Sequence, residues 1–302
     1  MLKEDASGSV SIVIPSYNGQ DLLAKNLPRV IQAAENPKNG IKEIIVVDDG
    51  STDGSIGFVR KTFPEVKLVS HKTNKGFSSA VNSGVGKSSG EFVVLLNNDV
   101  YPNDNFLENI LQFIVKDPDV FAVSFHQKGY GWARGRLQDG FVVHLPGSED
   151  VSPHPTFFVN AGGGIYRKDL WTKLGGMDEK LFSPFYWEDV DISYRAAKRG
   201  FKLFWHPDGI VSANLSATVN KIPKKLVSRI QERNQLLFIW KNLTSKNLFK
   251  KHLSGLARRV IKHPGYLLIA LTAISWLPKI LKLRRKEIKE SKVSDEAIFA
   301  GT

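Results

Sequence analysis

Five consecutive apolar residues, Phe92–Leu96, are followed directly by Asn97, Asn98 and Asp99. An apolar run without polar alternation is typical of a central strand in a sheet that is covered on both faces. In open α/β sheets, ligands bind outside the carboxyl ends of such strands. The polar triplet therefore predicts a ligand site at the end of this strand, although a plain strand-to-helix turn also favours Asn and Asp.

Strand and helix patterns alternate through the first hundred residues. Apolar runs at Ser9–Pro15, Ile44–Val47 and Val66–Ser70 are each followed by a helical pattern. This order predicts βαβ units and an α/β fold with a mostly parallel central sheet flanked by helices. The sequence has neither GxGxxG after the first strand nor GxxxxGK[ST], so the dehydrogenase and P-loop NTPase classes lose their main support.

Acidic residues occupy the strand ends where those classes carry glycine loops. Asp48 and Asp49 end the second strand, and Asp99 ends the central one. Carboxylates repel phosphates unless a cation lies between them, so a nucleotide diphosphate bridged by Mg²⁺ or Mn²⁺ is the economical hypothesis. The alternative for Asp48–Asp53 is a solvated turn in which Ser51 or Asp53 caps the next helix.

A third acidic group follows the aromatic run Phe185–Trp187. Glu188, Asp189 and Asp191 begin a helical pattern that continues to Gly200. A helix start keeps carboxylates ionised, and an ionised Asp beside aromatic residues suits a general base. The alternative is a helix N-cap with flanking acids.

Glycines 162–164 follow an expected strand at 157–159, and glycine there allows the backbone to approach a ligand closely. A bulge or tight bend is the other interpretation. The region from His126 to Pro155 predicts a hairpin or loop near the ligand. Helices are expected at 103–116, 168–174 and 229–240.

The carboxyl-terminal segment carries most of the net charge of +12. Between Lys246 and Glu290 there are twelve Lys or Arg and two Glu, a balance of +10. The apolar run Tyr266–Leu277 is too short for a membrane span of about 20 residues. Its basic flanks predict a helix in the membrane interface, and docking on the core or in a homodimer contact is the alternative. No nucleic-acid recognition motif accompanies the charge.

Further composition limits the chemistry and the compartment. The chain has no cysteine, which excludes disulfides, thiolate zinc sites and cysteine nucleophiles. The amino terminus is expected to lack a secretory signal, so the predicted location is the cytoplasm, peripheral on the inner face of the membrane. Two parts are expected, a catalytic domain at 1–240 and a basic helical segment at 241–302, with a polar, partly disordered tail from Lys286 to Thr302.

Six motifs together resemble the family 2 inverting glycosyltransferases with the GT-A fold, closest to a rhamnosyltransferase-like branch. In chain order they are VSIVIPSYNG, IIVVDDGSTDGS, NKGFSSAVNSG, FVVLLNNDV, NAGGGIYRKDLWTKLGGMDE and FYWEDVDISYRAAKRGFK. The resemblance covers roughly residues 9 to 240. It implies transfer of a sugar from a UDP- or dTDP-sugar donor to a hydroxyl of a polysaccharide or lipid-linked glycan.

The resemblance also implies roles for individual residues. Asp99 and Asn97 would hold the metal, and Asp189, with Glu188 beside it, would be the base. Gly162, Gly163, Gly164 and Trp187 would shape the pocket of donor sugar and acceptor. The nucleoside side would be formed by Pro15, Tyr17, Asp48, Asp49, Asn74, Lys75, Gly76 and Asn98.

Two departures from the family pattern concern the metal. Asn97 stands where many members have Asp, and no His occurs at the position near Ala213 where many members have a metal ligand. Asn214 and His206 are the substitutes that the sequence offers. The missing His leaves open a catalytically weak nucleotide-sugar-binding or assembly subunit. A sugar nucleotidyltransferase, which would share the sheet, is the other alternative, but PSYNG does not supply the Gly-rich loop with Lys or Arg expected after its first strand.

Overall fold

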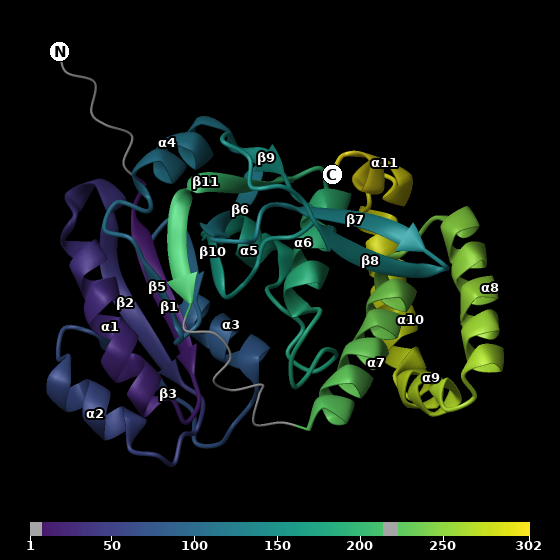
Figure 1. The fold of residues 1–302 in the computed structure, drawn as a ribbon, viewed down its shortest axis with the longest axis horizontal. Coiled ribbons are helices and arrows are strands. Elements are labelled where there is room, and N and C mark those ends of the chain that lie inside the picture. Colours follow the sequence, from purple (N-terminus) through teal and green to yellow (C-terminus); the bar gives the residue numbers. More distant parts are fainter. Residues whose placement is uncertain (1–7, 214–222) are drawn as a thin grey trace.

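The computed structural model describes residues 8–213 and 223–302, built around one large sheet (Figure 1). In the described part, the strand order is β3-β2-β1-β4-β10-β6-β11-β5, and β9 pairs with β11. The strands of this sheet are β1 (Val10–Ser16), β2 (Ile41–Asp48), β3 (Lys67–Ser70), β4 (Phe92–Leu96), β5 (Val100–Pro102), β6 (Val120–Gln127), β9 (His154–Pro155), β10 (Gly163–Arg167) and β11 (Lys202–Ala213).

The first four strands in the chain are parallel, as the βαβ pattern predicts. Beyond them the sheet is mixed, because β10 runs antiparallel to both of its neighbours, β4 and β6. β11 is parallel to β6, and β5 is antiparallel to β11. The carboxyl ends of β1, β2, β4 and β11 therefore lie at one edge of the sheet, where the sequence predicts the ligand site.

Helices cover both faces of the sheet and separate two hydrophobic clusters. The side chains of β4 alternate between them, with Phe92, Val94 and Leu96 in one cluster and Val93 and Leu95 in the other. This double burial explains the uninterrupted apolar run. The first cluster is completed by α1 (Gln20–Glu35), α2 (Ser55–Thr62) and α4 (Glu108–Lys116), and the second by α3 (Phe77–Lys87), α5 (Lys168–Leu174) and α6 (Glu188–Lys198). A short 3-10 turn, η1 (Pro37–Asn39), joins α1 to β2.

A third hydrophobic cluster lies among the carboxyl-terminal helices, α6 and a separate hairpin (Figure 1). The hairpin, β7 (Ala133–Gln138) and β8 (Phe141–Pro146), confirms the hairpin expected within residues 126–155. The helices are α7 (Lys224–Asn242), α8 (Lys246–Lys262), α9 (Tyr266–Ile274), α10 (Leu277–Glu290) and α11 (Asp295–Ala300).

Three local predictions are wrong. The expected disordered tail is helical, because Asp295 and Ile298 of α11 are buried against the rest of the molecule. The helix expected from Asn103 begins only at Glu108, because the Asn39 side chain binds the backbone in the preceding turns. No strand forms at 157–159, where the backbone is bonded to Ala133 and Ser193, and the glycines instead begin β10.

Within the described residues, no single helix has the length and apolar composition needed to cross a bilayer. α9 and α10 together reach that length and composition, and the two helices are bent by 70° relative to each other.

Candidate active site

The end of β2 holds two buried carboxylates in different surroundings. Asp49 accepts hydrogen bonds from the backbone N–H groups of Lys75 (2.9 Å) and Gly76 (2.8 Å). Asp48 Oδ2 accepts one from the N–H of Ser51 at 3.0 Å, whereas Asp48 Oδ1 is buried with no partner among the described residues. Asp49 therefore orders the loop that begins α3, and Asp48 keeps a free acceptor at the sheet edge.

His71, which the sequence did not single out, completes this group. Its Nδ1 lies 2.7 Å from Asp49 Oδ1, and its Nε2 lies 2.9 Å from the Ser83 hydroxyl of α3. The sequence signal that could have identified it is its position directly after β3, at the same edge as Asp48. His71 fixes the carboxylate that in turn fixes the loop at 74–76.

Ser16 connects the ends of three strands. Its carbonyl accepts from the N–H of Asp49 at 2.8 Å, and its hydroxyl accepts from the Asn98 side chain at 3.0 Å. Pro15 and Tyr17 flank Ser16, and the Tyr17 side chain is 40% exposed. The predicted nucleoside residues of β1, β2 and β4 are thus brought together at one edge.

The metal motif predicted at the end of β4 is half-buried. Asp99 has a pKa above its ordinary value because burial penalises the charged carboxylate. Asn97 lies against Gly162, whose carbonyl accepts from the N–H of Asn97 at 3.1 Å. A Cβ at position 162 would lie 2.5 Å from the Asn97 amide nitrogen, so a larger residue there would displace the Asn97 side chain.

The same glycine loop reaches the predicted base. The N–H of Ala161 donates to the Asp189 carboxylate, one residue before the contact of Gly162 with Asn97. Two neighbouring residues therefore join motifs that lie about ninety positions apart in the sequence. Gly163 and Gly164 continue this loop into β10 beside β4.

Glu188 and Asp189 occupy the first turn of α6, as the sequence predicts. Burial raises the pKa of Asp189 to about 6, against backbone hydrogen bonds that favour its charged form. Burial and the neighbouring Asp189 charge raise the pKa of Glu188 well above its ordinary value, and Glu188 Oε2 has no partner among the described residues. The pair suits one ionised and one protonated carboxyl near neutral pH.

The residues before this helix have an unusual backbone conformation. Tyr186 and Trp187 have φ angles of 73° and 77°, which cost side-chain-bearing residues about 1–3 kcal/mol each. The indole of Trp187 is buried and lies 5.0 Å, centroid to centroid, from Phe238 of α7. Backbone strain of this kind occurs where the surrounding structure enforces it.

Asn234 of α7 holds the loop in this backbone conformation. Its fully buried side chain donates to the carbonyls of Phe182, Phe185 and Tyr186 at 2.9 to 3.0 Å. Arg233 adds a hydrogen bond to the Ser183 carbonyl. The loop before Glu188 is therefore held from α7, a role that packing of the helix on the core does not by itself imply.

Asp191, the third acid of this motif, is structural. It is fully buried, 2.7 Å from Lys241 Nζ and 2.8 Å from Arg195 Nε, and it also accepts from the Asn242 side chain. Burial alone would raise its pKa, but the charges of Lys241 and Arg195 outweigh burial and lower the pKa to about 2. Asp191 fastens α6 to the end of α7.

The two substitutes for the missing family histidine have different outcomes. His206 is buried, its Nδ1 accepts from the N–H of Asp208 at 3.2 Å, and its ring packs edge-to-face on Phe113 of α4. These contacts favour a packing role. Asn214 lies outside the described residues, and within those residues no group of three His, Cys, Asp or Glu side chains could hold a metal.

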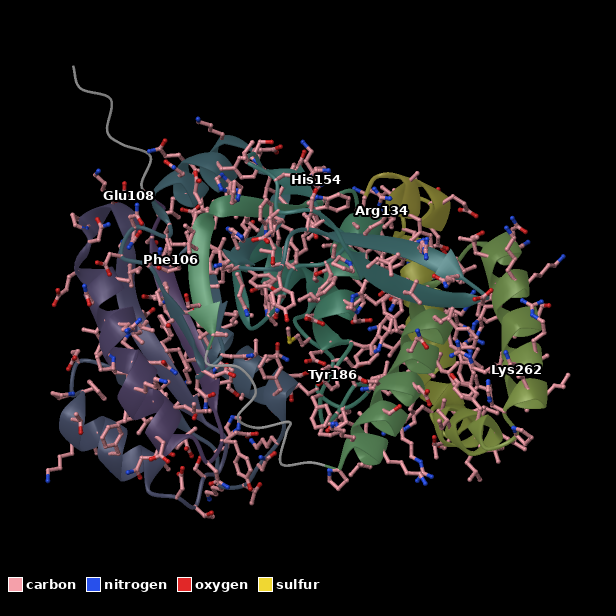
Figure 2. All side chains as sticks on the ribbon, in the orientation of Figure 1. Phe106, Glu108, Arg134, His154, Tyr186 and Lys262 are labelled. Carbon is pink, nitrogen blue, oxygen red and sulfur yellow. The ribbon has the colours of Figure 1, made fainter. Side chains whose placement is uncertain are left out.

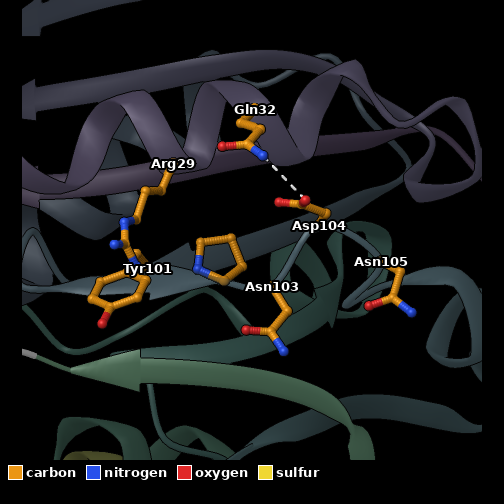
Figure 3. A pocket seen from close by; sticks show the side chains of 7 residues that line it. Arg29, Gln32, Tyr101, Asn103, Asp104 and Asn105 are labelled. Carbon is orange, nitrogen blue, oxygen red and sulfur yellow. Dashed lines mark hydrogen bonds between the residues drawn. The ribbon is translucent and has the colours of Figure 1, made fainter.

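A cavity of about 480 Å³ lies beside the strand that follows Asp99, and no predicted site residue lines it (Figure 3). In Figure 3 the Gln32 amide reaches Asp104, and the Arg29 guanidinium lies 4.3 Å from the Tyr101 ring centroid. The cavity is open and polar, and we place the candidate site instead where the three acidic motifs meet. Its lining residues are Arg29, Gln32, Tyr101, Pro102, Asn103, Asp104 and Asn105.

A solved glycosyltransferase structure shares this architecture. The structure of GalNAc-T7 with UDP, GalNAc and Mn²⁺ has a TM-score of 0.65 and 16% sequence identity, covering 88% of this chain and 58% of that one. The fold is therefore the GT-A glycosyltransferase fold.

Sequence comparison identifies the family. Residues 11–175 match glycosyl transferase family 2, and the chain belongs to that family of transferases. The Pre-mycofactocin glycosyltransferase of Mycobacterium tuberculosis is 28% identical over 216 residues, covering 67% of this chain and 42% of that protein. This chain thus spans less than half the length of that relative. The rhamnosyltransferase-like branch stays a prediction.

A relative from Methanococcus voltae is 23% identical over 236 residues, covering 72% of this chain and 71% of its own length. Its name is Dolichyl N-acetyl-alpha-D-glucosaminyl phosphate 3-beta-D-2,3-diacetamido-2,3-dideoxy-beta-D-glucuronosyltransferase.

Proposed function

We propose that this chain is an inverting glycosyltransferase that moves a sugar from a nucleotide diphosphate sugar, UDP- or dTDP-linked, to a glycan hydroxyl. One observation carries the proposal. Ala161 and Gly162 connect Asp189, a carboxylate with a pKa of about 6, to Asn97 and the strand end that holds Asp99. This link supports a base beside the strand ends where a nucleotide diphosphate would bind.

The nucleoside would lie across the ends of β1 and β2. Support comes from the unpartnered Asp48 Oδ1, from the exposed Tyr17 and from the loop that Asp49 orders. Asp49 would act on the nucleoside through that loop. The remaining members of this group are Pro15, Asn74, Lys75, Gly76 and Asn98.

The residues at the end of β4 suit a divalent cation bound together with the diphosphate. Asp99 is a half-buried carboxylate whose pKa is raised by burial, and Asn97 offers an amide oxygen beside it. Mg²⁺ and Mn²⁺ accept such oxygen ligands and take the rest of their coordination from phosphate and water. Such a cation, when bound, neutralises charge on the departing diphosphate.

Asp189 would act as the base. Its carboxylate accepts the proton of the acceptor hydroxyl as that oxygen bonds to the anomeric carbon, and the bond from carbon to diphosphate oxygen breaks with both electrons leaving on the diphosphate. A single displacement inverts the anomeric configuration. Glu188, which burial keeps protonated, would add no second charge beside Asp189, and Gly162–Gly164 with Trp187 would bound the sugar pocket.

The acceptor would be a polysaccharide or lipid-linked glycan at the inner face of the cell membrane. The printed name of the Methanococcus voltae relative, which contains a dolichyl phosphate, supports this acceptor class. The excess of basic residues between Lys246 and Glu290 supports attraction to an anionic membrane surface.

Turnover of purified protein with a panel of UDP-, dTDP- and GDP-sugars tests the proposal, with Mg²⁺ or Mn²⁺ and with EDTA. We expect one donor to be consumed in a metal-dependent way, with kcat rising with pH through about 6 as Asp189 ionises. Asp189→Asn should lower kcat by about a hundredfold or more while the donor still binds. Asp99→Ala should weaken the response to metal.

Asp104→Ala is the matched control, because Asp104 lies five residues beyond Asp99 and its carboxylate accepts a hydrogen bond from the exposed Gln32 side chain of α1. It should leave turnover unchanged. Donor binding without turnover in the wild type would instead indicate an assembly subunit. Release of pyrophosphate from a nucleoside triphosphate and a sugar phosphate would indicate a nucleotidyltransferase.

A further inference from the structure

Helix α9 has one buried and one exposed face, and both are apolar. Tyr266, Ala270 and Ala273, spaced at i, i+4 and i+7, are buried in the third hydrophobic cluster. The opposite side of the helix presents Leu267, Leu268, Leu271 and Ile274, whose exposed fractions run from 46% to 64%. A helix that only packs on a core carries polar residues on that outer side.

Helix α10 continues the exposed apolar row. Ile280 and Glu287 are buried, while Leu277, Leu281 and Ile288 are 38% to 54% exposed. We call the exposed apolar residues of the two helices the C-terminal apolar face; they are Leu267, Leu268, Leu271, Ile274, Leu277, Leu281 and Ile288. Contiguous exposed apolar residues of this kind mark an interaction surface.

Positive charge surrounds this face and is almost uncompensated. Within residues 246–290, all of which the structure describes, Glu287 is buried and Glu290 is exposed, and both pair with Arg199 of the catalytic part. No other acid occurs in this range. The exposed cations are Lys246, Lys250, Lys251, Arg258, Lys262, Lys282, Arg285, Lys286 and Lys289.

We propose that the C-terminal apolar face docks on an anionic lipid bilayer, with the leucines in the acyl boundary and the cations at the headgroups. Apolar side chains fit the acyl boundary of such a bilayer, and flanking Lys and Arg fit its anionic headgroups. A second copy of the chain is a poor occupant, because its own cations would repel these. The docking does not depend on the proposed function. Only the reaction that the docked protein would carry out rests on it.

The docked face is fixed to the predicted active site. Lys279 of α10 lies 2.8 Å from Asp178, whose carboxylate also accepts from the N–H of Leu181 in the loop that leads to Glu188. Arg284 donates to the Trp240 carbonyl at the end of α7. The two bent helices are therefore attached to the body of the enzyme and do not form a separate anchor.

Helix α9 and the loop before the predicted base lie toward the same edge in the view of Figures 1 and 2. In Figure 1, α9 lies at the lower edge, toward which the carboxyl end of β11 also points. In the same orientation, Tyr186, which precedes the predicted base, lies low in Figure 2, whereas Arg134 and His154 lie at the top. Docking through α9 thus turns the catalytic edge toward the lipid, so the acceptor class is a glycan carried by a membrane lipid.

Vesicle flotation with the full chain tests the docking without any donor. Vesicles of phosphatidylcholine with about 30 mol% phosphatidylglycerol should carry the protein, and pure phosphatidylcholine vesicles should carry much less. The double variant Leu268→Asn and Leu271→Asn should lower partitioning to the anionic vesicles by about tenfold or more. Lys282→Gln with Arg285→Gln should lower it in proportion to the lost charge.

Tyr130→Ser is the matched control, since Tyr130 is 58% exposed and lies outside this face; it should float like the wild type. Equal flotation of the leucine variant would overturn the proposal. So would a dimer in sedimentation that the leucine variant dissociates, because a second copy would then cover the face. Turnover of a soluble donor is measured separately, so loss of turnover with intact flotation contradicts only the proposed function.

Discussion

Three acids within four positions of α6 have three different environments, and these differences decide what each can do. Asp191 is neutralised by Lys241 and Arg195, Asp189 meets the backbone of Ala161, and Glu188 has an oxygen without a partner among the described residues. The sequence predicts that Glu188 and Asp189 begin a helix. It cannot separate the three pKa values, because burial raises those of Glu188 and Asp189, whereas Lys241, fifty positions away, helps to lower that of Asp191.

The raised pKa of Asp189 has a consequence for stability. The folded protein binds this proton more tightly than the unfolded chain, so stability falls as pH rises from the ordinary value of 3.8 to about 6, and the full cost is present above that. Asp189→Asn should therefore raise the free energy of unfolding at about pH 7 by about 1 kcal/mol, a reduced figure because solvent reaches part of the carboxylate.

Urea unfolding at about pH 7 and about pH 4 measures this difference, and the gain should vanish at the lower pH. Asp208→Asn, an exposed carboxylate that lies far from the predicted base in the chain, is the control. A gain of equal size at both pH values would contradict ionisation of Asp189 as its cause.

At the scale of elements, β4 has the bounds that its apolar run predicts, and α6 begins at Glu188 as predicted but ends at Lys198, before the expected Gly200. The support of the loop before α6 was not predictable, since Asn234 binds carbonyls 48 to 52 positions earlier. The end of α10, from Lys286, and the whole of α11 were predicted as a tail, because Ile298 is one of few buried apolar side chains in that range.

Asn234→Ala should separate loop support from donor binding. It removes hydrogen bonds to three carbonyls of the loop at 182–186, leaving buried acceptors unpaired at a cost of about 1–3 kcal/mol. We expect kcat to fall while donor affinity, which depends on β1, β2 and β4, stays within about twofold. Steady-state kinetics with the identified donor, together with donor titration, measure both effects.

Asn109→Ala is the matched control, because Asn109 is an exposed amide with a single hydrogen bond to Asp208. Loss of donor affinity in Asn234→Ala equal to the loss in kcat would indicate that the whole fold, and not the loop, depends on Asn234.

At the scale of the whole molecule, the predicted boundary between residues 240 and 241 divides a continuous structure. It falls inside α7 and separates Asp191 from Lys241, its ion-pair partner. The third hydrophobic cluster contains residues of both predicted parts, such as Tyr194 and Ile280. Such contacts are invisible in sequence, where a change of charge at residue 246 gives the only signal of a division.

A chain that ends at Trp240 should therefore not fold stably. It would leave the buried Asp191 without Lys241, which costs about 3–5 kcal/mol, and would expose one side of the third cluster. Thermal melting followed by circular dichroism should show no cooperative transition for this chain, or a much lower midpoint than the full chain. Lys241→Met in the full chain measures how much of the lost stability comes from the ion pair with Asp191. Cooperative melting of the short chain near the midpoint of the full chain would instead support two independent domains.

The buried Asp295 joins two parts of the chain that are far apart in sequence. It accepts from the Tyr194 hydroxyl and from Lys198 at 2.7 Å each, and 101 positions separate Tyr194 from Asp295. Closing a loop of that length is slow and entropically costly compared with local pairing. During synthesis, α6 therefore gains these two hydrogen bonds only after the chain has been extended past residue 295.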